Sequence, residues 1–341
     1  MPTIRTATAK ACELSAAEVL AESVWLSWDR FVQQDALVYR TVESTRFVGS
    51  AAGNAASPPS VRVTTANPSI DIQRVDPRNV DAVHRARVAL RRIRSNIRLA
   101  RRLFDEAWTD VVLADLSWYA GELGAVRDWD VMHARVLDAC DRVRSLATPS
   151  EAARLEVGEK ILIENLEHER QRCFGDLLVA RGDSRFQRLL TLMPAGLEEV
   201  SSGADRGEGA DVMRKLVAKQ WRRFAAHAEA TRREPTDAAL HDLRVSVKRV
   251  RYAADMATPV IGAASRRFST EASALQDVLG EYHDSTVVRA WLMKVSPLVP
   301  PVATFTAGQV SLAEAEASAK LRAAWPKCWS RLEKFGKKTF G

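Results

Sequence analysis

The 341-residue sequence has few cysteines and no long apolar stretch. Its four cysteines show no CxxC or zinc-ligand spacing, so we expect scattered reduced thiols. No segment approaches the ~20 consecutive apolar residues of a membrane span, and no charged N-terminal region is followed by an apolar run. These absences lead us to expect a cytoplasmic protein with no membrane partner. The cysteines are Cys12, Cys140, Cys173 and Cys328.

Motifs that mark many phosphate-handling enzymes are also missing. The chain has no glycine-rich GxxxxGK[ST] loop and no HExxH pair, and its basic helices offer no carboxylates placed to hold Mg²⁺. A metal site made from His84, His133, His241 and His283 has no spacing argument behind it. We therefore predict no catalytic residues, no metal site and no cofactor, and we expect a binding protein rather than an enzyme.

What the chain does contain is a stretch of concentrated positive charge. Residues 83–104 read VHRARVALRRIRSNIRLARRLF, and no carboxylate occurs before Asp105. At about 100° per residue along a helix, apolar residues such as Leu90 and Ile93 take one side and the basic residues take the other. We predict an amphipathic helix with a cationic face. That face carries His84, Arg87, Arg91, Arg92, Arg94, Arg98 and Arg102.

Such a face needs negative charge from outside the helix. Like charges three or four residues apart repel by ~0.2–0.5 kcal/mol per pair. The formal net charge of +7 is modest, but the positive charge is clustered and the carboxylates gather in other segments. For one helix, neighbouring Asp and Glu side chains and a polyanionic ligand are both open explanations.

A second copy of the pattern favours the ligand. Residues 240–257 read LHDLRVSVKRVRYAADMA, and LGAVRD at 123–128 aligns with LGEYHD at 279–284, at nearly the same distance from each histidine. We infer an internal duplication. In the second copy the basic residues are His241, Arg244, Lys248, Arg249 and Arg251, followed by Tyr252.

The remaining sequence predicts an all-α fold, because long segments follow the 3.6-residue period and no alternating strand runs occur. We expect a disordered N-terminus over 1–14, a first helical bundle over 15–200 and a second over 201–341. A capping box at Ser15 begins the first helix, which we expect to end near Arg40. Residues 44–79, rich in Gly, Ser and Pro, form an insertion, more simply a loop than a short hairpin.

The paired motifs VHxxRVxxRRxR and LHxxRVxxKRxRY, each followed by LGxxRD or LGxxHD, resemble the CHAD domain (conserved histidine α-helical domain). The resemblance covers nearly the whole chain. It implies two pseudo-twofold-related four-helix bundles with a basic groove or pore between or along them. It further implies binding of inorganic polyphosphate, association with polyphosphate granules and no catalytic turnover. The ExExK signature of a triphosphate-tunnel domain, often fused to this family, is absent.

For a polyphosphate site we expect the cations of both copies to act together, with Arg127 beside them and Lys215, Lys219 and Arg222 as outer contacts. Asp128 and Asp284 are expected to hold Arg or His side chains in place. His84 and His241 either donate to phosphate or bond to a carboxylate such as Asp128 or Asp284. Tyr252 either donates its hydroxyl or packs in the core.

Two other functions share this cationic footprint. A nucleic-acid-binding protein would use it too, although no aromatic residues are interleaved with the cations. A polyphosphate-acting phosphohydrolase or kinase, or an accessory to one, is the second alternative. The sequence leaves the oligomeric state and the preferred chain length open.

Overall fold

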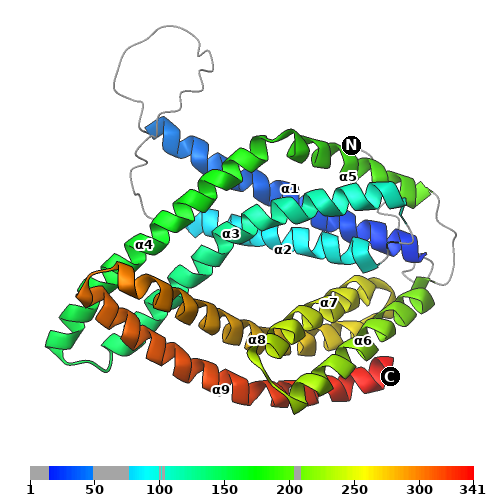
Figure 1. Ribbon diagram of the computed structural model, residues 1–341. Helices are drawn as coiled ribbons and strands as arrows, with labels where there is room; N and C mark the ends of the chain where they lie inside the picture. Colours follow the sequence, from blue (N-terminus) through cyan, green and yellow to red (C-terminus); the bar gives the residue numbers. More distant parts are fainter. Residues whose placement is uncertain (1–14, 49–76, 100, 102–103, 203–208) are drawn as a thin grey trace, which may run out of the picture.

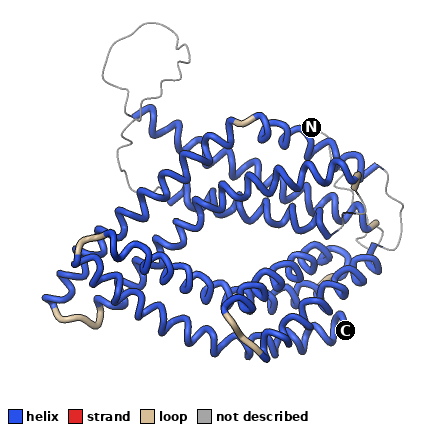
Figure 2. The backbone as a smooth tube through the Cα atoms, in the orientation of Figure 1, coloured by secondary structure: helices blue, strands red, loops and turns tan. Residues whose placement is uncertain are grey.

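Helices make up almost all of the structure (Figures 1 and 2). The computed structural model describes residues 15–48, 77–99, 101, 104–202 and 209–341. Within these ranges there are nine α-helices and no strand, so the predicted all-α class is confirmed.

The described helices fall into two sets along the chain. The first half contains α1 (Ala16–Val48), α2 (Pro77–Leu99), α3 (Glu106–Arg144), α4 (Pro149–Gly182) and α5 (Ser184–Ser202). The second half contains α6 (Gly209–Arg233), α7 (Asp237–Ile261), α8 (Ala263–Val295), the 3₁₀ turn η3 (Ser296–Leu298) and α9 (Pro301–Phe340). Proline at the first position of α9 fits because that residue needs no N–H donor.

Helix boundaries show where local sequence signals work. The backbone N–H of Ser15 donates to the Glu18 carboxylate at 2.8 Å, and the Glu18 N–H donates to Ser15 Oγ at 3.2 Å, which confirms the predicted capping box. The other end of α1 was predicted too short, since the helix runs past Arg40 to Val48. The predicted insertion over 44–79 is too long at both ends, because 44–48 and 77–79 are helical. Residues 1–14 and 49–76 lie outside the described ranges.

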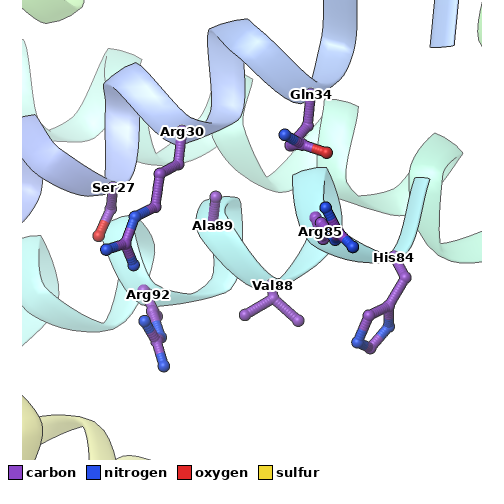
Figure 3. Close-up of a pocket in the computed structure, with 8 residues that line it drawn as sticks. All are labelled: Ser27, Arg30, Gln34, His84, Arg85, Val88, Ala89 and Arg92. Carbon is purple, nitrogen blue, oxygen red and sulfur yellow. The ribbon is translucent and has the colours of Figure 1, made fainter. Parts of the chain in front are cut away.

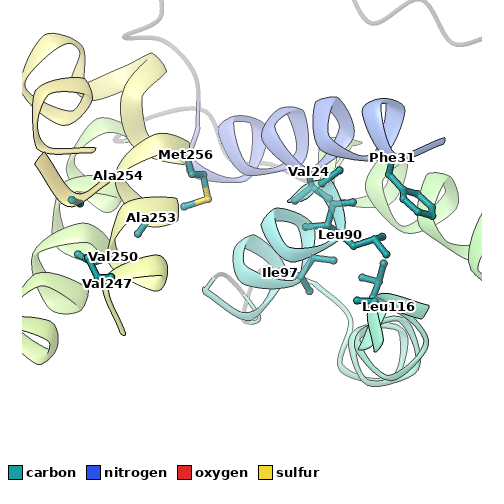
Figure 4. Packing of buried hydrophobic residues seen from close by; sticks show 14 of the residues in the cluster. Val24, Phe31, Leu90, Ile97, Leu116, Val247, Val250, Ala253, Ala254 and Met256 are labelled. Carbon is teal, nitrogen blue, oxygen red and sulfur yellow. The ribbon is translucent and has the colours of Figure 1, made fainter. Parts of the chain in front are cut away.

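Each half packs its own helices around a shared apolar interior. In the first half α1, α2, α3 and α5 are in contact, and in the second α6, α7, α8 and α9 are. The apolar residues of α2 expected to face inward, among them Leu90, Ile93 and Ile97, are fully buried. Figure 4 shows Leu90 and Ile97 packed with side chains of α1 and α3, while Val247 and Val250 line the α7 side of the same core cluster.

A second core joins the two halves where the long helices converge. The far ends of α3 and α4 meet those of α8 and α9, at the left of Figure 1. This second cluster includes Val136, Leu162, Leu166, Leu292 and Val310. Four helices, two from each half, therefore hold one end of the molecule together. The duplication itself stays an inference from the sequence.

A buried charge lies beside this junction. The Glu314 side chain on α9 is 0% exposed and accepts hydrogen bonds from Arg135 Nε at 2.6 Å, Arg142 Nη2 at 2.7 Å and Ser285 Oγ at 2.6 Å. Arg135 and Arg142 belong to α3 and Ser285 to α8, so one carboxylate ties three helices from both halves.

Candidate functional site

The two basic helices face each other across the halves. Helices α2 and α7 are in contact, and Arg92 Nη2 on α2 lies 3.9 Å from the Asp255 carboxylate on α7. Their amphipathic pattern explains this placement, because each helix buries its apolar side in its own half and turns its basic side toward the other half. We call the residues that meet here the central cluster: Arg87, Arg91, Arg244, Lys248, Arg251 and Tyr252.

Mutual repulsion within the central cluster is evident from its electrostatics. Burial lowers the pKa of Arg91, and the positive charges of Arg87, Arg244 and Arg251 lower it further, although Tyr252 acts in the opposite direction. The pKa of Arg244 is likewise lowered by burial and by Arg87, against the raising effect of Asp284. Charges from both halves are thus close enough to act on one another.

Lys248 is the most perturbed cation of the cluster. Burial, together with the charges of Arg244, Arg91 and Arg87, lowers its pKa from 10.5 to about 7. No ion pair of the Lys248 ammonium or of the Arg91 guanidinium exists among the residues that the structure describes. An ammonium in this state gains strongly from an added anion.

Two carboxylates hold the innermost arginines. Arg87 Nη1 lies 2.6 Å from the Asp128 carboxylate, and Arg244 Nη2 lies 3.7 Å from that of Asp284. The pairs occupy matching places in the two halves, α2 with α3 and α7 with α8. Asp284 is itself desolvated, and burial raises its pKa while Arg244 lowers it. These contacts orient the guanidinium groups and offset only part of the positive charge.

Several donors of the site have no partner. The Nε atoms of five arginines and the Tyr252 hydroxyl are buried and make no hydrogen bond within the described chain. A buried polar group left unpaired costs ~1–3 kcal/mol, so the cations of the site carry this cost together with their mutual repulsion. The five arginines are Arg91, Arg92, Arg94, Arg244 and Arg251.

Within the described chain, neither His84 nor His241 forms an ion pair with a carboxylate. His241 Nδ1 lies 3.3 Å from Nδ1 of His283 on α8. The hypothesis that His241 bonds to Asp128 or Asp284 therefore has no contact to support it. Burial and the charges of Arg127 and Arg91 lower the pKa of His84, as expected for a histidine among arginines. His283 was not among the predicted site residues. Its alignment with Arg127, which was predicted to lie in the site, would have indicated it.

Among the predicted cations, two are anchored on the following helix and five are exposed. Arg94 Nη2 donates to Ser117 Oγ at 2.9 Å, and Arg251 Nη1 to Ser273 Oγ at 3.4 Å, so both are anchored on the following helix. In the described chain no hydrogen bond or ion pair joins the exposed cations to the cluster, and Arg102 lies outside the described residues. The exposed cations are Arg98, Lys215, Lys219, Arg222 and Arg249.

One pocket adjoins the site. It has a volume of about 260 Å³ and lies between α1 and α2 (Figure 3). Among the described residues no group of three or more His, Cys, Asp or Glu side chains is placed to hold a metal ion. Within the same ranges, none of the helices is apolar over a length that would cross a bilayer.

Fold and site together define an all-α protein in which two helical halves bring their most basic faces together. A model of the CHAD domain family matches residues 71–293, which span α2 to nearly the end of α8. The chain belongs to the CHAD domain family.

Two individual relatives match part of the chain. The uncharacterized proteins MT2285 and Rv2226 of two Mycobacterium tuberculosis strains are each 29% identical over 251 residues, covering 71% of this chain. The matched region spans 46% of the length of those relatives.

Two solved structures share the fold. PptA from Streptomyces chartreusis superposes with a TM-score of 0.64 at 17% identity, covering 93% of this chain and 100% of its own. The CHAD domain from the plant Ricinus communis superposes with a TM-score of 0.60 at 19% identity, covering 96% and 92%.

Proposed function

We propose that this protein binds inorganic polyphosphate in the central cluster. The observation that carries the proposal is the pair Arg91 and Lys248. These cations come from opposite halves, have pKa values lowered by burial and by positive charges from the facing helix, and lack ion pairs in the described chain. A polyanion lying between α2 and α7 would neutralise both at once.

The chemistry of the cluster suits a phosphate chain. Polyphosphate carries about one negative charge per phosphate and has no base or sugar to recognise. Arginines repeated along rigid helices offer forked donors to successive phosphate oxygens. Two facing cationic helices would also concentrate the field and speed capture of the anion.

The same geometry disfavours nucleic acid as the natural ligand. Single-stranded nucleic acid is usually held by aromatic rings on which bases stack. Tyr252, the aromatic residue of the central cluster, is 5% exposed, so its ring face is not available for stacking. RNA and long-chain polyphosphate should therefore compete unequally at equal phosphate concentration, and stronger binding of RNA would favour the nucleic-acid alternative.

In this proposal the protein binds polyphosphate without catalysing a reaction on it. The carboxylates nearest the cluster, Asp128 and Asp284, are engaged by arginines, and a phosphoryl-transfer centre would need them for metal ions. In this role the protein acts in the cytoplasm, at polyphosphate granules. Orthophosphate release by the purified protein, abolished in His84→Ala, would argue for an enzyme instead.

A calorimetric titration with polyphosphates of graded length at two salt concentrations tests the binding. Affinity should rise with chain length until the cluster is filled and should fall steeply with salt, because bound phosphates release counterions. The double variant Arg91→Glu/Lys248→Glu should bind about 100-fold more weakly, which corresponds to roughly 1.4 kcal/mol for each of two lost contacts.

A control variant separates this effect from a change in net charge. Lys219→Glu/Arg222→Glu alters the charge by the same amount on the exposed face of α6 and should weaken binding only a few-fold. Circular dichroism should show unchanged helicity in both. Equal losses in the two double variants would contradict a site at the central cluster.

A further inference from the structure

The pocket between α1 and α2 has a composition unlike that of an ordinary groove between helices. We call it the α1–α2 pocket. Four of the eight residues that line it carry basic side chains, and none of the eight is acidic. Its lining consists of Ser27, Arg30 and Gln34 from α1, and His84, Arg85, Val88, Ala89 and Arg92 from α2.

The cations of the pocket are only weakly neutralised. Arg30 has no ion pair with any residue that the structure describes, and Figure 3 shows its side chain extending toward α2. Arg92 has one carboxylate nearby, Asp255 at 3.9 Å, and its buried Nε makes no hydrogen bond within the described chain. Arg85 contacts Asp81 at 3.2 Å, but both side chains are well exposed, so this pair contributes little.

The neutral residues leave space and polar groups for a phosphate. Val88 and Ala89 have short side chains, which leave space between α1 and α2 for a ligand. Gln34 brings an amide group that can donate to a phosphate oxygen. The Ser27 hydroxyl is occupied, because it donates to the Ser23 carbonyl at 2.9 Å.

His84 connects the pocket with the central cluster. It lines the pocket, and the charges of Arg91 and Arg87 act on it together with that of Arg127. We propose that the α1–α2 pocket is a second phosphate subsite, which receives the polyphosphate chain where it leaves the central cluster past His84. This inference rests on the proposed function and extends its binding surface onto α1 through Arg30, Gln34 and Arg85.

The second half of the chain does not offer the same subsite. Aligning WDRF at 28–31 with WRRF at 221–224 matches Arg30 with Arg223 and Gln34 with His227. The basic motifs match Arg85 with Asp242. A carboxylate thus stands in the second half where the pocket has an arginine, so the polyanion should leave the cluster on the α1 side.

The matched residues provide the test. In titrations with long-chain polyphosphate, Arg30→Ala should lower the affinity about 5-fold. It should also reduce the slope of log affinity against log salt by about 1, the contribution of one phosphate contact. Arg223→Ala removes the same charge from an exposed place on α6 and should change neither quantity. Identical behaviour of the two variants would overturn the subsite, although the central cluster could still bind.

A variant that binds more tightly provides a second test, because a misfolded variant would not gain affinity. Gln34→Arg adds a donor to the pocket and should tighten polyphosphate binding and steepen the salt dependence, whereas His227→Arg at the matched place should not. Equal gains in both variants would also overturn the subsite. Failure of the unaltered protein to bind polyphosphate at all would overturn the proposed function and the subsite together.

Discussion

His241 on α7 and His283 on α8 place their imidazole rings in contact, with the two Nδ1 atoms 3.3 Å apart, the ring centroids 4.8 Å apart and the ring planes tilted by 51°. In the first half the matching residues are His84 and Arg127, and Arg127 is close enough for its charge to lower the pKa of His84. The two halves therefore place different side chains beside an equivalent histidine, an arginine in one half and a second histidine in the other.

This difference predicts a variant that binds more tightly. Burial and the charges of Arg244, His241 and Lys248 lower the pKa of His283 to about 4, so its ring is neutral at pH 7. His283→Arg would place a permanent charge where the first half already tolerates one. We expect polyphosphate affinity at pH 7 to rise about 3- to 10-fold, since one added charge near an anion contributes on the order of 1 kcal/mol.

The reverse exchange is the control. Arg127→His removes a permanent charge from the matched place and should weaken binding by a similar factor, with both affinities measured by calorimetry at one salt concentration. An unchanged affinity in His283→Arg would mean that the ligand does not reach this histidine pair.

Proton uptake should accompany binding near neutral pH. With a pKa of about 7, Lys248 is only partly protonated between pH 7 and 9 in the free protein, and a bound polyanion raises that pKa. Affinity should therefore fall as the pH rises above 7 and change little from this group below pH 7. Burial lowers the pKa of His84 in the free protein, so His84 should add uptake at lower pH than Lys248 as the bound polyanion raises that pKa.

Calorimetry in buffers of different ionisation enthalpy measures this uptake at pH 8. In Lys248→Arg the uptake should disappear, because an arginine stays protonated in this range. Lys219→Arg, on the exposed face of α6, should leave it unchanged. Uptake that persists in Lys248→Arg would assign the proton to another group.

The sequence could predict these helices because their signals are local. The 3.6-residue period of α2 identified Leu90, Ile93 and Ile97 as inward-facing, and all three are fully buried. The Ser15 capping box likewise depends on residues three apart. The end of α1 was predicted too early because composition suggested a loop from residue 44, although Gly49, directly after Val48, is a helix-stop signal in the sequence.

The assembly of the site depends on contacts that periodicity does not specify. A basic face predicts which side of α2 avoids its own core, but not which residues meet α7. Lys215, Lys219 and Arg222 share the charge of the cluster residues and are exposed on α6 instead. The junction of α3 and α4 with α8 and α9 was also not predicted, since an apolar stripe on one helix does not specify which helix packs against it.

Removing the ammonium group from Lys248 should stabilise the fold. Its pKa is about 7 in the folded protein and 10.5 ordinarily, so protonation in the folded state is disfavoured. The resulting destabilisation grows as the pH falls from 10.5 to about 7 and is constant below that. Lys248→Met should therefore raise the free energy of unfolding at pH 7 by about 1–2 kcal/mol, while weakening polyphosphate binding.

Thermal or urea denaturation at pH 7 and pH 10 checks this expectation. The gain in Lys248→Met over the unaltered protein should be smaller at pH 10, where the lysine is neutral in the folded state. A gain that does not depend on pH would show that packing, rather than desolvation of the charge, is responsible.

Loss of the carboxylate at Glu314 should weaken the junction between the halves. This side chain is fully buried and accepts bonds from Arg135 and Arg142, so its removal leaves two guanidinium groups without their main partner. Breaking a buried ion pair from one side costs roughly 3–5 kcal/mol. We expect Glu314→Ala to lower the free energy of unfolding by about that amount, measured by urea denaturation.

Glu316→Ala gives the matched control, because Glu316 lies two residues further along α9 and is exposed; its effect should stay within about 0.5 kcal/mol. Arg135 also lowers the pKa of Asp284, which in turn lies beside Arg244. If the junction positions the central cluster, Glu314→Ala should reduce polyphosphate affinity even at temperatures where the variant is folded. A destabilised variant with full affinity would limit Glu314 to holding the helices together.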